Sequence, residues 1–282
     1  MPYDPTVLLN GLYFGEAPRW HEGRLWLSDM HGHQVLKVDM NGHVEKVVEV
    51  PNQPSGLGWL PDGRLLIVSM IDRKLMRLDP VGLTVVADLS SMASYHCNDM
   101  VVNVNGDAYV GNFGSDWVGR LPDPANLILV KPDGKASIVA EGLQFPNGSV
   151  ITPDGRTLIL AETFGRQLTA FDINKDGTLT NRRVWADVSP AYPDGICLDS
   201  ENAVWIPSAE DGGKRVLRIA EGGKVLDHID FNQNTYACAL GGEGRRTLFV
   251  LTADSSVPTI AKAKPTGRVV YVRVKIPGAG LP

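Results

Sequence analysis

An internal repeat constrains the fold of this chain more than any other feature of its sequence. Six short apolar runs each follow a tight turn, and the second residue of that turn falls at positions 23, 63, 106, 155, 202 and 244. Successive turns are therefore 40, 43, 49, 47 and 42 residues apart. Repeats of this length are typical of solenoids and β-propellers, in which every repeat is one supersecondary unit.

A second hairpin-like segment follows each apolar run. Examples are "HQVLKVDMNG" from His33 and "NLILVKPDGK" from Asn126, in which apolar and polar residues alternate before Asn-Gly or Asp-Gly. Alternation with a period of two indicates strands, and these dipeptides favour hairpin turns. Because each repeat holds about four short strands, the sequence predicts an all-β fold, a six-bladed β-propeller with four-stranded blades.

The same pattern predicts the domain limits and the closure of the ring. We expect residues 1–282 to form a single propeller domain, because the repeats cover nearly the whole chain. Pairing of N- and C-terminal strands, in "LYFGEAPRW" from Leu12 and "RVVYVRV" from Arg268, would close the ring. A linear stack of sheets would instead need polar capping repeats, which the sequence does not show.

Charge and composition narrow the classes of partner. The chain has 27 Lys and Arg against 32 Asp and Glu, a formal net charge of -5, whereas nucleic acids and anionic membranes select a basic face. We therefore expect no nucleic acid or membrane partner, and a monomer or weak homo-oligomer. No apolar run could span a bilayer and no secretory leader is evident, so cytoplasm is the expected location. Cys97, Cys197 and Cys238 lack disulfide or zinc spacing and are interpreted as buried apolar residues.

Six oxygen-bearing side chains share one register when the first strand of every repeat is aligned on the turn that ends it. The positions are found by counting back from the second residue of each turn, by seven residues in the shorter first turn and by eight in the others. They are Glu16, Ser55, Asn98, Asn147, Asp194 and Tyr236. In a propeller the first strand of each blade runs along the central channel, so equivalent positions form a ring at one depth. Small residues follow most of these positions, which suits a channel where backbones crowd near the axis: they are Ala17, Gly56, Gly148, Gly195 and Ala237.

Carboxylates and carboxamides in a narrow channel would repel one another or lack partners unless a cation joined them. Oxygen ligands at about 2.3–2.6 Å are those that Ca²⁺ takes, while Zn²⁺, Mn²⁺ and Mg²⁺ also suit mixed donor sets. The ring therefore predicts a site for one divalent metal ion, with Ca²⁺ favoured. The alternative is local, because "FPNG" and "YPDG" are common turn sequences in which Asn147 and Asp194 would simply shape turns.

Four segments resemble those of the gluconolactonase, regucalcin (senescence marker protein) and luciferin-regenerating enzyme family of six-bladed propellers. They are "GEAPRW" with Glu16, "NDM" with Asn98, "FPNGSVITPDGRTLILAE" with Asn147, and "PDGICLDSENAVW" with Asp194. The resemblance runs from about residue 12 to residue 255. It implies a divalent metal held by Glu16, Asn147 and Asp194. It also implies that Asn98 contacts substrate and that Asp194 transfers a proton.

The expected substrate-binding positions differ from those of the best-known sugar lactonases. Two residues before the position of Asn98 those proteins carry an arginine, and this chain has His96. Where they carry an acidic pair in the following loop, this chain has "GNFGSDWVG" with Asp116. These departures bear on specificity for sugar acids and leave the metal ligands unchanged. The loop of residues 113–126 is a candidate lid with Trp117 as its apolar contact, and His31 is a further candidate to overhang the pocket.

The ring and the resemblance together predict a metal-dependent hydrolase that opens a cyclic ester, a lactone, with sugar lactones as one candidate class. A metal-bound water would attack the carbonyl carbon, Asp194 would accept a proton, and Asn98 would stabilise the oxyanion. Three alternatives stay open. The same ring serves an organophosphate (phosphotriester) hydrolase, a non-enzymatic calcium-binding propeller needs no acid–base group, and a propeller similar to strictosidine synthase needs no ring of metal ligands.

Overall fold

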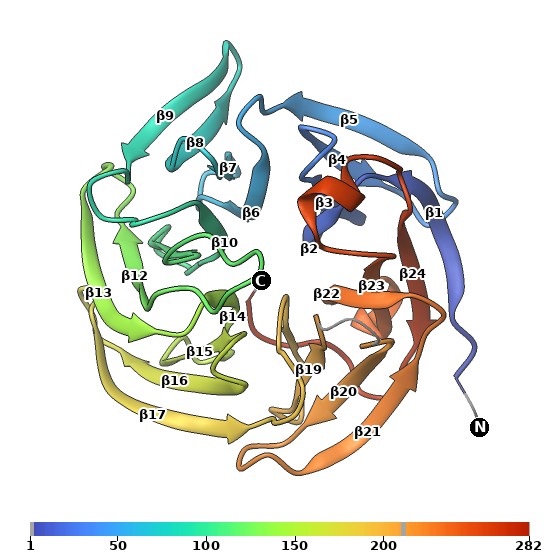
Figure 1. Cartoon of the computed structure of the whole chain (residues 1–282). Helices are drawn as coiled ribbons and strands as arrows, with labels where there is room; N and C mark the ends of the chain where they lie inside the picture. Colours follow the sequence, from blue (N-terminus) through green and yellow to red (C-terminus); the bar gives the residue numbers. More distant parts are fainter. Residues whose placement is uncertain (1–2, 210–212, 282) are drawn as a thin grey trace.

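The computed structural model describes residues 3–209 and 213–281. Its strands form six four-stranded antiparallel sheets arranged as a ring (Figure 1). The predicted six-bladed β-propeller with four-stranded blades is therefore confirmed. The expected domain limits, residues 1 and 282, lie outside the described residues, so the single domain over 1–282 stays a prediction.

Each of the first five blades is built in chain order from an inner strand at the axis to an outer strand at the rim. The first three blades are β2 (Gly15–His21), β3 (Arg24–Asp29), β4 (Gln34–Val38) and β5 (Val44–Glu49); β6 (Pro54–Trp59), β7 (Leu65–Ser69), β8 (Lys74–Asp79) and β9 (Gly82–Asp88); and β10 (Cys97–Val102), β11 (Ala108–Asn112), β12 (Ala125–Val130) and β13 (Ala136–Leu143). The next two are β14 (Pro146–Ile151), β15 (Thr157–Glu162), β16 (Gln167–Ile173) and β17 (Leu179–Asp187); and β18 (Cys197–Leu198), β19 (Val204–Pro207), β20 (Arg215–Ile219) and β21 (Val225–Asp230).

The sixth blade closes the ring with strands from both ends of the chain. It contains β22 (Asn234–Gly241), β23 (Thr247–Ala253), β24 (Gly267–Arg273) and, outermost, β1 (Thr6–Leu12). Closure by the two ends is confirmed, but the N-terminal partner lies mainly upstream of the stretch expected to pair. Most of that stretch becomes inner strand β2, because its residues from Gly15 to Arg19 are buried at the axis while β1 is largely exposed.

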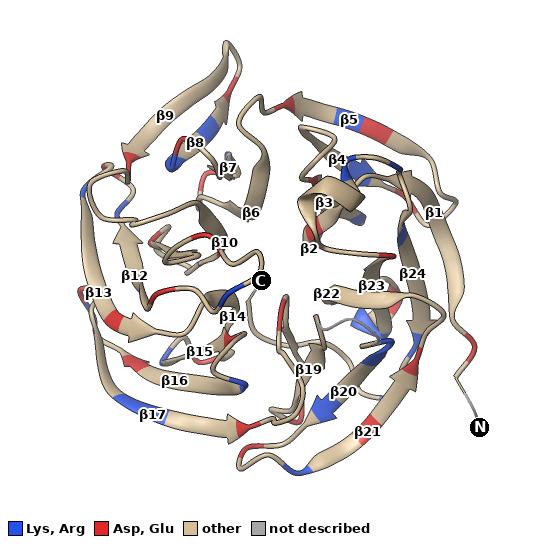
Figure 2. Cartoon of the chain, viewed as in Figure 1, with Lys and Arg blue, Asp and Glu red and all other residues tan. Residues whose placement is uncertain are grey.

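The middle strands explain why the repeated apolar runs are continuous and do not alternate. Each blade packs against two neighbours, so a strand such as β7, "LLIVS", is buried on both faces. Outer strands such as β5 are exposed and carry charges of both signs (Figure 2). Helix is confined, in the described part of the chain, to one turn of 3-10 helix, η1 (Glu243–Arg245), and α1 (Pro258–Ala261). None of these described helices has the length or hydropathy needed to cross a membrane.

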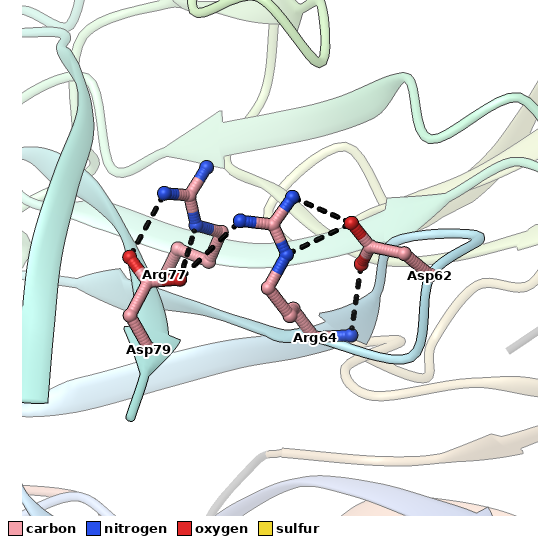
Figure 3. A network of polar contacts seen from close by, with 4 residues as sticks. All are labelled: Asp62, Arg64, Arg77 and Asp79. Carbon is pink, nitrogen blue, oxygen red and sulfur yellow. Dashed lines mark hydrogen bonds and ion pairs between the residues drawn. The ribbon is translucent and has the colours of Figure 1, made fainter. Parts of the chain in front are cut away.

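An ion-pair network ties one hairpin turn to its blade (Figure 3). Arg64 Nε donates to Asp62 Oδ2 at 2.8 Å within the Pro-Asp-Gly turn between β6 and β7, and Arg64 Nη1 also reaches Asp79 Oδ1 on β8 at 3.3 Å. Arg77 donates to both oxygens of Asp79 at 2.8 Å, and these hydrogen bonds hold the pKa of that carboxyl well below its usual range. Because the network lies at the blade edge, water limits what it contributes to stability.

A short segment after β24 connects three blades at the end of the channel where the inner strands have their C-terminal ends. Leu281 exchanges two backbone hydrogen bonds with Ile151 at the end of β14, at 2.8 and 2.9 Å. Other residues of the segment 277–281 bond to the carbonyl oxygens of Leu198 in blade five and of Arg245, which follows β22 in blade six. Residues 277–281 therefore fasten the C-terminal ends of inner strands, whereas the candidate site lies at their N-terminal ends.

Replacing Gly280 with alanine should loosen this connection. Gly280 has a φ of +67°, and a Cβ there would lie 2.3 Å from the carbonyl oxygen of Ile151. The left-handed backbone costs about 1–2 kcal/mol, and displacing the segment weakens hydrogen bonds worth about 1 kcal/mol each. We therefore expect the free energy of unfolding to fall by about 2–4 kcal/mol in urea titrations.

Gly23 provides the matched control for Gly280→Ala. Its φ is +74° and a Cβ would meet nothing within 4 Å, so Gly23→Ala should cost only the backbone term of about 1–2 kcal/mol. Equal losses in the two variants would contradict a stabilising role for residues 277–281.

Candidate functional site

The N-terminal ends of the inner strands open into a cavity of about 620 Å³. Glu16, Asn98, Asn147 and Asp194 all line it, and all four are buried. They belong to β2, β10, β14 and the segment that leads into β18. Four of the six positions aligned in the sequence thus meet in one cavity, and they are called here the floor residues.

The other two ring positions differ from the expectation, because neither lines the cavity. Ser55 has a short side chain, and its backbone oxygen accepts a hydrogen bond from Ser28 Oγ at 2.6 Å. Tyr236 is buried in an apolar cluster, and its ring centroid lies 4.8 Å from that of Phe14. The ring of six oxygen donors predicted from the register is therefore a set of four.

A β-bulge in the inner strand accompanies the ring position in five blades. The pairing of β2, β6, β10, β14 and β22 with their second strands shifts register beside the ring residue. A bulge leaves a residue out of the ladder and changes the direction of its side chain. In blade five, β18 begins only at Cys197, so Asp194 precedes the strand. These irregularities allow the floor residues to face the cavity.

The alternative that Asn147 and Asp194 merely shape turns is wrong. The glycines that follow them, Gly148 and Gly195, lack the positive φ of a hairpin glycine such as Gly63, which has a φ of +83°. Instead they permit close approach between blades, since a Cβ on Gly148 would lie 2.6 Å from the carbonyl oxygen of Asp194. In blade five the Pro-Asp-Gly sequence therefore lets neighbouring inner strands approach closely and does not form a hairpin turn.

Hydrogen bonds orient both carboxamides of the floor. Asn147 Nδ2 donates to Thr163 Oγ1 at 3.1 Å, and Thr163 Oγ1 donates to the carbonyl oxygen of Pro193 at 2.8 Å. Asn98 Nδ2 donates to the carbonyl oxygen of Pro146 at 3.3 Å. Each amide thus commits an N–H to the protein, and its side-chain oxygen is left to accept a partner in the cavity.

Negative charge exceeds positive charge beneath the cavity. Glu16, Asp99 and Asp194 are buried, and the buried guanidinium of Arg19 bonds to Asp99 Oδ1 at 2.6 Å. Burial, then the charges of Asp194 and Asp99, raise the pKa of Glu16 well above its usual range. Burial, then the charge of Asp99, raise the pKa of Asp194, and a hydrogen bond from Asn147 opposes this rise. Within the described residues, no ion pair offsets Glu16 or Asp194.

This donor set has the chemistry of a site for a hard divalent cation. Two carboxylates and two carboxamide oxygens match the ligands of Ca²⁺, and a charge of about +2 would offset two carboxylates whose burial is otherwise costly. Over residues 3–209 and 213–281 no group of three or more His, Cys, Asp or Glu could hold a metal. Any site here therefore depends on amide oxygens, which favours Ca²⁺ over Zn²⁺.

The residues expected to contact substrate also surround the cavity. His96, Asp116 and Trp117 line it, as does His31. The candidate lid, residues 113–126, joins β11 to β12 and borders the cavity through four of its residues. Its contact with substrate stays a prediction.

Sequence reasoning missed most of the cavity wall. Two residues before the ring positions the chain has Phe14, Gln53, His96, Phe145, Tyr192 and Asn234, of which the first five line the cavity. The signal was present in the register, because each of these five residues precedes an inner strand and lies two positions before a ring residue. Lys262, next to α1, also lines the cavity, and a single helical turn has no periodicity by which to find it.

Two histidines of the wall are held neutral. Burial, then the positive charges of Lys262 and His33, lower the pKa of His31 to about 4. His31 Nδ1 lies 3.2 Å from Gln53 Nε2. In a neutral imidazole this nitrogen can accept a hydrogen bond from the Gln53 amide. Burial is also the main cause that lowers the pKa of His96. Near neutral pH both rings therefore serve as uncharged hydrogen-bonding groups.

The His31 shift predicts a loss of stability on acidification. An unfolded histidine takes up a proton below its ordinary pKa of about 6.5, whereas folded His31 does so only near 4. Between these values the unfolded chain binds more protons, so the free energy of unfolding falls as the pH falls. In His31→Gln, melting temperatures between pH 7 and 4.5 should fall less than in the wild type. His228→Gln, on the surface strand β21, is the control, and an unchanged pH profile in His31→Gln would contradict the prediction.

These features define a class of protein: a six-bladed propeller with an acidic, amide-lined cavity at one end of its channel. Residues 14–254 match the family described as SMP-30/Gluconolactonase/LRE-like region, and the chain belongs to this family. The match covers the five inner strands from β2 to β18, the inner strand β22, and all four floor residues.

Similar proteins extend over nearly the whole chain. A 6-deoxy-6-sulfogluconolactonase from Pseudomonas putida is 26% identical over 291 residues, covering 99% of this chain and 95% of that protein. A pentonolactonase from Haloferax volcanii is 26% identical and covers 85% and 81%. The solved structure of a calcium-binding protein, regucalcin, from Agrobacterium tumefaciens strain C58 is 21% identical with a TM-score of 0.82, covering 100% and 97%. The similarity to this solved structure shows a shared fold.

Proposed function

We propose that this protein is a lactonase that depends on one divalent metal ion, Ca²⁺ in the first place. The observation that carries the proposal is the pairing of two buried carboxylates, Glu16 and Asp194, with two carboxamides on the floor of one cavity. Two of the similar proteins are named as lactonases, and a third is described as calcium-binding. A small-molecule lactone is accordingly the proposed partner.

The floor residues have separable roles in this proposal. Glu16, Asn147 and Asp194 would hold the cation, which when bound polarises the ester carbonyl and makes water more acidic. Asp194 accepts a proton from the attacking water as the new C–O bond forms, and returns it to the ring oxygen as the ester bond breaks. Asn98 uses one N–H on the carbonyl of Pro146, and its second N–H donates to the oxyanion.

Residues farther from the floor would orient the substrate. His96, Asp116 and Trp117 border the cavity from blade three and its loop, and we propose that they contact the lactone. The cytoplasmic location and the monomeric or weakly associating state expected from the sequence stay predictions.

Calcium binding should release protons and strengthen as the pH rises. Without a cation the raised pKa values of Glu16 and Asp194 keep protons on this pair, and a cation must displace them. We expect isothermal titration calorimetry in buffers of different ionisation enthalpy to show proton release. Glu16→Gln should weaken Ca²⁺ by about 100-fold or more, since even partners of metal ligands contribute about 10–100-fold. Glu45→Gln, on exposed β5, is the control, and an affinity independent of pH from 6 to 9 would oppose the proposal.

Asp194→Asn tests the proton-transfer role apart from metal binding. The amide keeps an oxygen ligand and loses the base, so lactone hydrolysis should fall by about 10²–10⁴-fold, while calorimetry still detects Ca²⁺ binding. Hydrolysis of γ- and δ-lactones is measured before and after chelation, beside a panel of phosphotriesters. Intact metal-dependent turnover in Asp194→Asn would remove its assigned role. Turnover of phosphotriesters alone would favour an organophosphate hydrolase, and Ca²⁺ binding without turnover would favour a binding protein.

A further inference from the structure

Above the floor, blades three to five present a continuous aromatic wall, which is defined by Phe113, Phe145, Phe164 and Tyr192. Phe113 stacks on Phe145 with centroids 4.5 Å apart and planes at 15°. Phe164 meets Phe145 edge-on at 5.2 Å and Tyr192 edge-on at 6.0 Å. All four rings line the cavity. They come from four separate segments, so the fold gathers them on one side of the space above the floor residues.

The facing side of the cavity is also largely apolar. Blades one and two, with the strand ends next to them, contribute Phe14, Met30, Met70 and Ile71. Phe14, Met30 and Met70 are buried and belong to the apolar cluster that holds Tyr236. A molecule bound over the floor therefore meets aromatic rings on one side and apolar groups on the other.

Several of the described polar groups on these sides already have partners within the protein. Gln53 Nε2 lies 3.2 Å from His31 Nδ1, and the imidazole of His96 stacks on Tyr95 with centroids 4.2 Å apart. Thr163 Oγ1 accepts from one floor amide and donates to a backbone oxygen. A lactone with a hydroxyl on every ring carbon would press several of them against ring faces, where they lose water without gaining a partner.

Among the residues that the structure describes, the charged side chains of the cavity lie outside this space. Asp116 and Lys262 are exposed residues on the lid and beside α1, so they border the entrance. The charged floor residues Glu16 and Asp194 are at the other end. Between entrance and floor the cavity is therefore suited to an uncharged group.

Phe145 keeps its ring in the wall at a position where the backbone disfavours it. It is buried with a φ of +62°, a conformation that is unusual for a bulky side chain. Gln53 has the same register in blade two and a φ of +66°, so two of the six blades share this conformation. Glycine or asparagine would relieve the strain at position 145, whereas phenylalanine there contributes a ring to the aromatic wall.

We propose that the substrate is a lactone whose ring carries an apolar substituent, an aryl group in the first place, and not a polyhydroxylated sugar lactone. This inference rests on the lactonase function proposed above and specifies its substrate class. The ester lies over Glu16, Asn98 and Asp194, and the substituent extends between the aromatic wall and the apolar side facing it. Edge and face contacts with Phe113, Phe145, Phe164 and Tyr192 then recognise an aromatic ring.

The first test compares three δ-lactones on the calcium-loaded protein: δ-phenyl-δ-valerolactone, unsubstituted δ-valerolactone and D-glucono-δ-lactone. We expect kcat/KM for the phenyl lactone to exceed that for the glucono lactone by about 100-fold, the discrimination that an apolar pocket achieves for apolar groups. The unsubstituted lactone should fall between them. A glucono lactone hydrolysed as fast as the phenyl lactone, or faster, overturns the inference and leaves the lactonase proposal intact.

The second test truncates the wall where truncation spares the core. Phe164 is half-buried, and Phe164→Ala should lower kcat/KM for the phenyl lactone by about 10-fold relative to δ-valerolactone. Because the readout is a ratio between two substrates, loss of folded protein cancels. Tyr271→Ala, a half-buried tyrosine on β24 outside the cavity, should leave the ratio unchanged. An unchanged ratio in Phe164→Ala contradicts the inference.

A binding measurement separates failure of the inference from failure of the proposed function. The lactam analogue, 6-phenylpiperidin-2-one, has the same ring and substituent and resists hydrolysis. If no lactone is turned over, the lactonase proposal fails, and calorimetry with this lactam still decides the inference. Binding that Phe164→Ala weakens and Tyr271→Ala preserves supports recognition of an apolar substituent. Absence of binding, or equal binding by both variants, overturns it.

Discussion

The contact of inner strands around a single axis is the constraint on which the rest of this structure depends. A Cβ added to Gly56, Gly148 or Gly195 would lie 2.5 Å from an atom of the next blade. Adjacent backbones therefore touch, and little room remains for side chains between them near the axis. The polar side chains beside these glycines turn toward the open end of the channel, where bulges in the ladder accommodate them. The cavity and its charge follow from this close approach.

Burial of two acids at that point makes the site electrostatically incomplete. Asp99 bonds to the buried guanidinium of Arg19, and the negative charge of Asp99 still raises the pKa of both Glu16 and Asp194. The positive charge of Arg19 lowers the pKa of Glu16, but burial and the two neighbouring carboxylates outweigh it. Without a cation the two acids therefore retain protons, and the cation proposed for this site would replace those protons.

The repeat spacing and the turn sequences were sufficient to predict six blades, the ring closure and the depth at which Glu16, Asn98, Asn147 and Asp194 lie. These features follow from periodicity, which a single sequence displays. The burial of Tyr236 against apolar neighbours could not be predicted, because the direction of a side chain beside a bulge depends on packing between blades. The closing strand β1 was misplaced because outer and inner strands differ in burial more than in local pattern.

The shared register of the blades also divides the cavity lining into two layers. The residue two positions before each floor residue precedes the inner strand and also lines the cavity. Each of these four blades therefore supplies one oxygen-bearing floor residue and one residue of the cavity wall. Substitution of a wall residue leaves the converging glycines and the floor oxygens in place, so the shape of the cavity can change while the floor chemistry stays. The pairs in this chain are Phe14 with Glu16, His96 with Asn98, Phe145 with Asn147, and Tyr192 with Asp194.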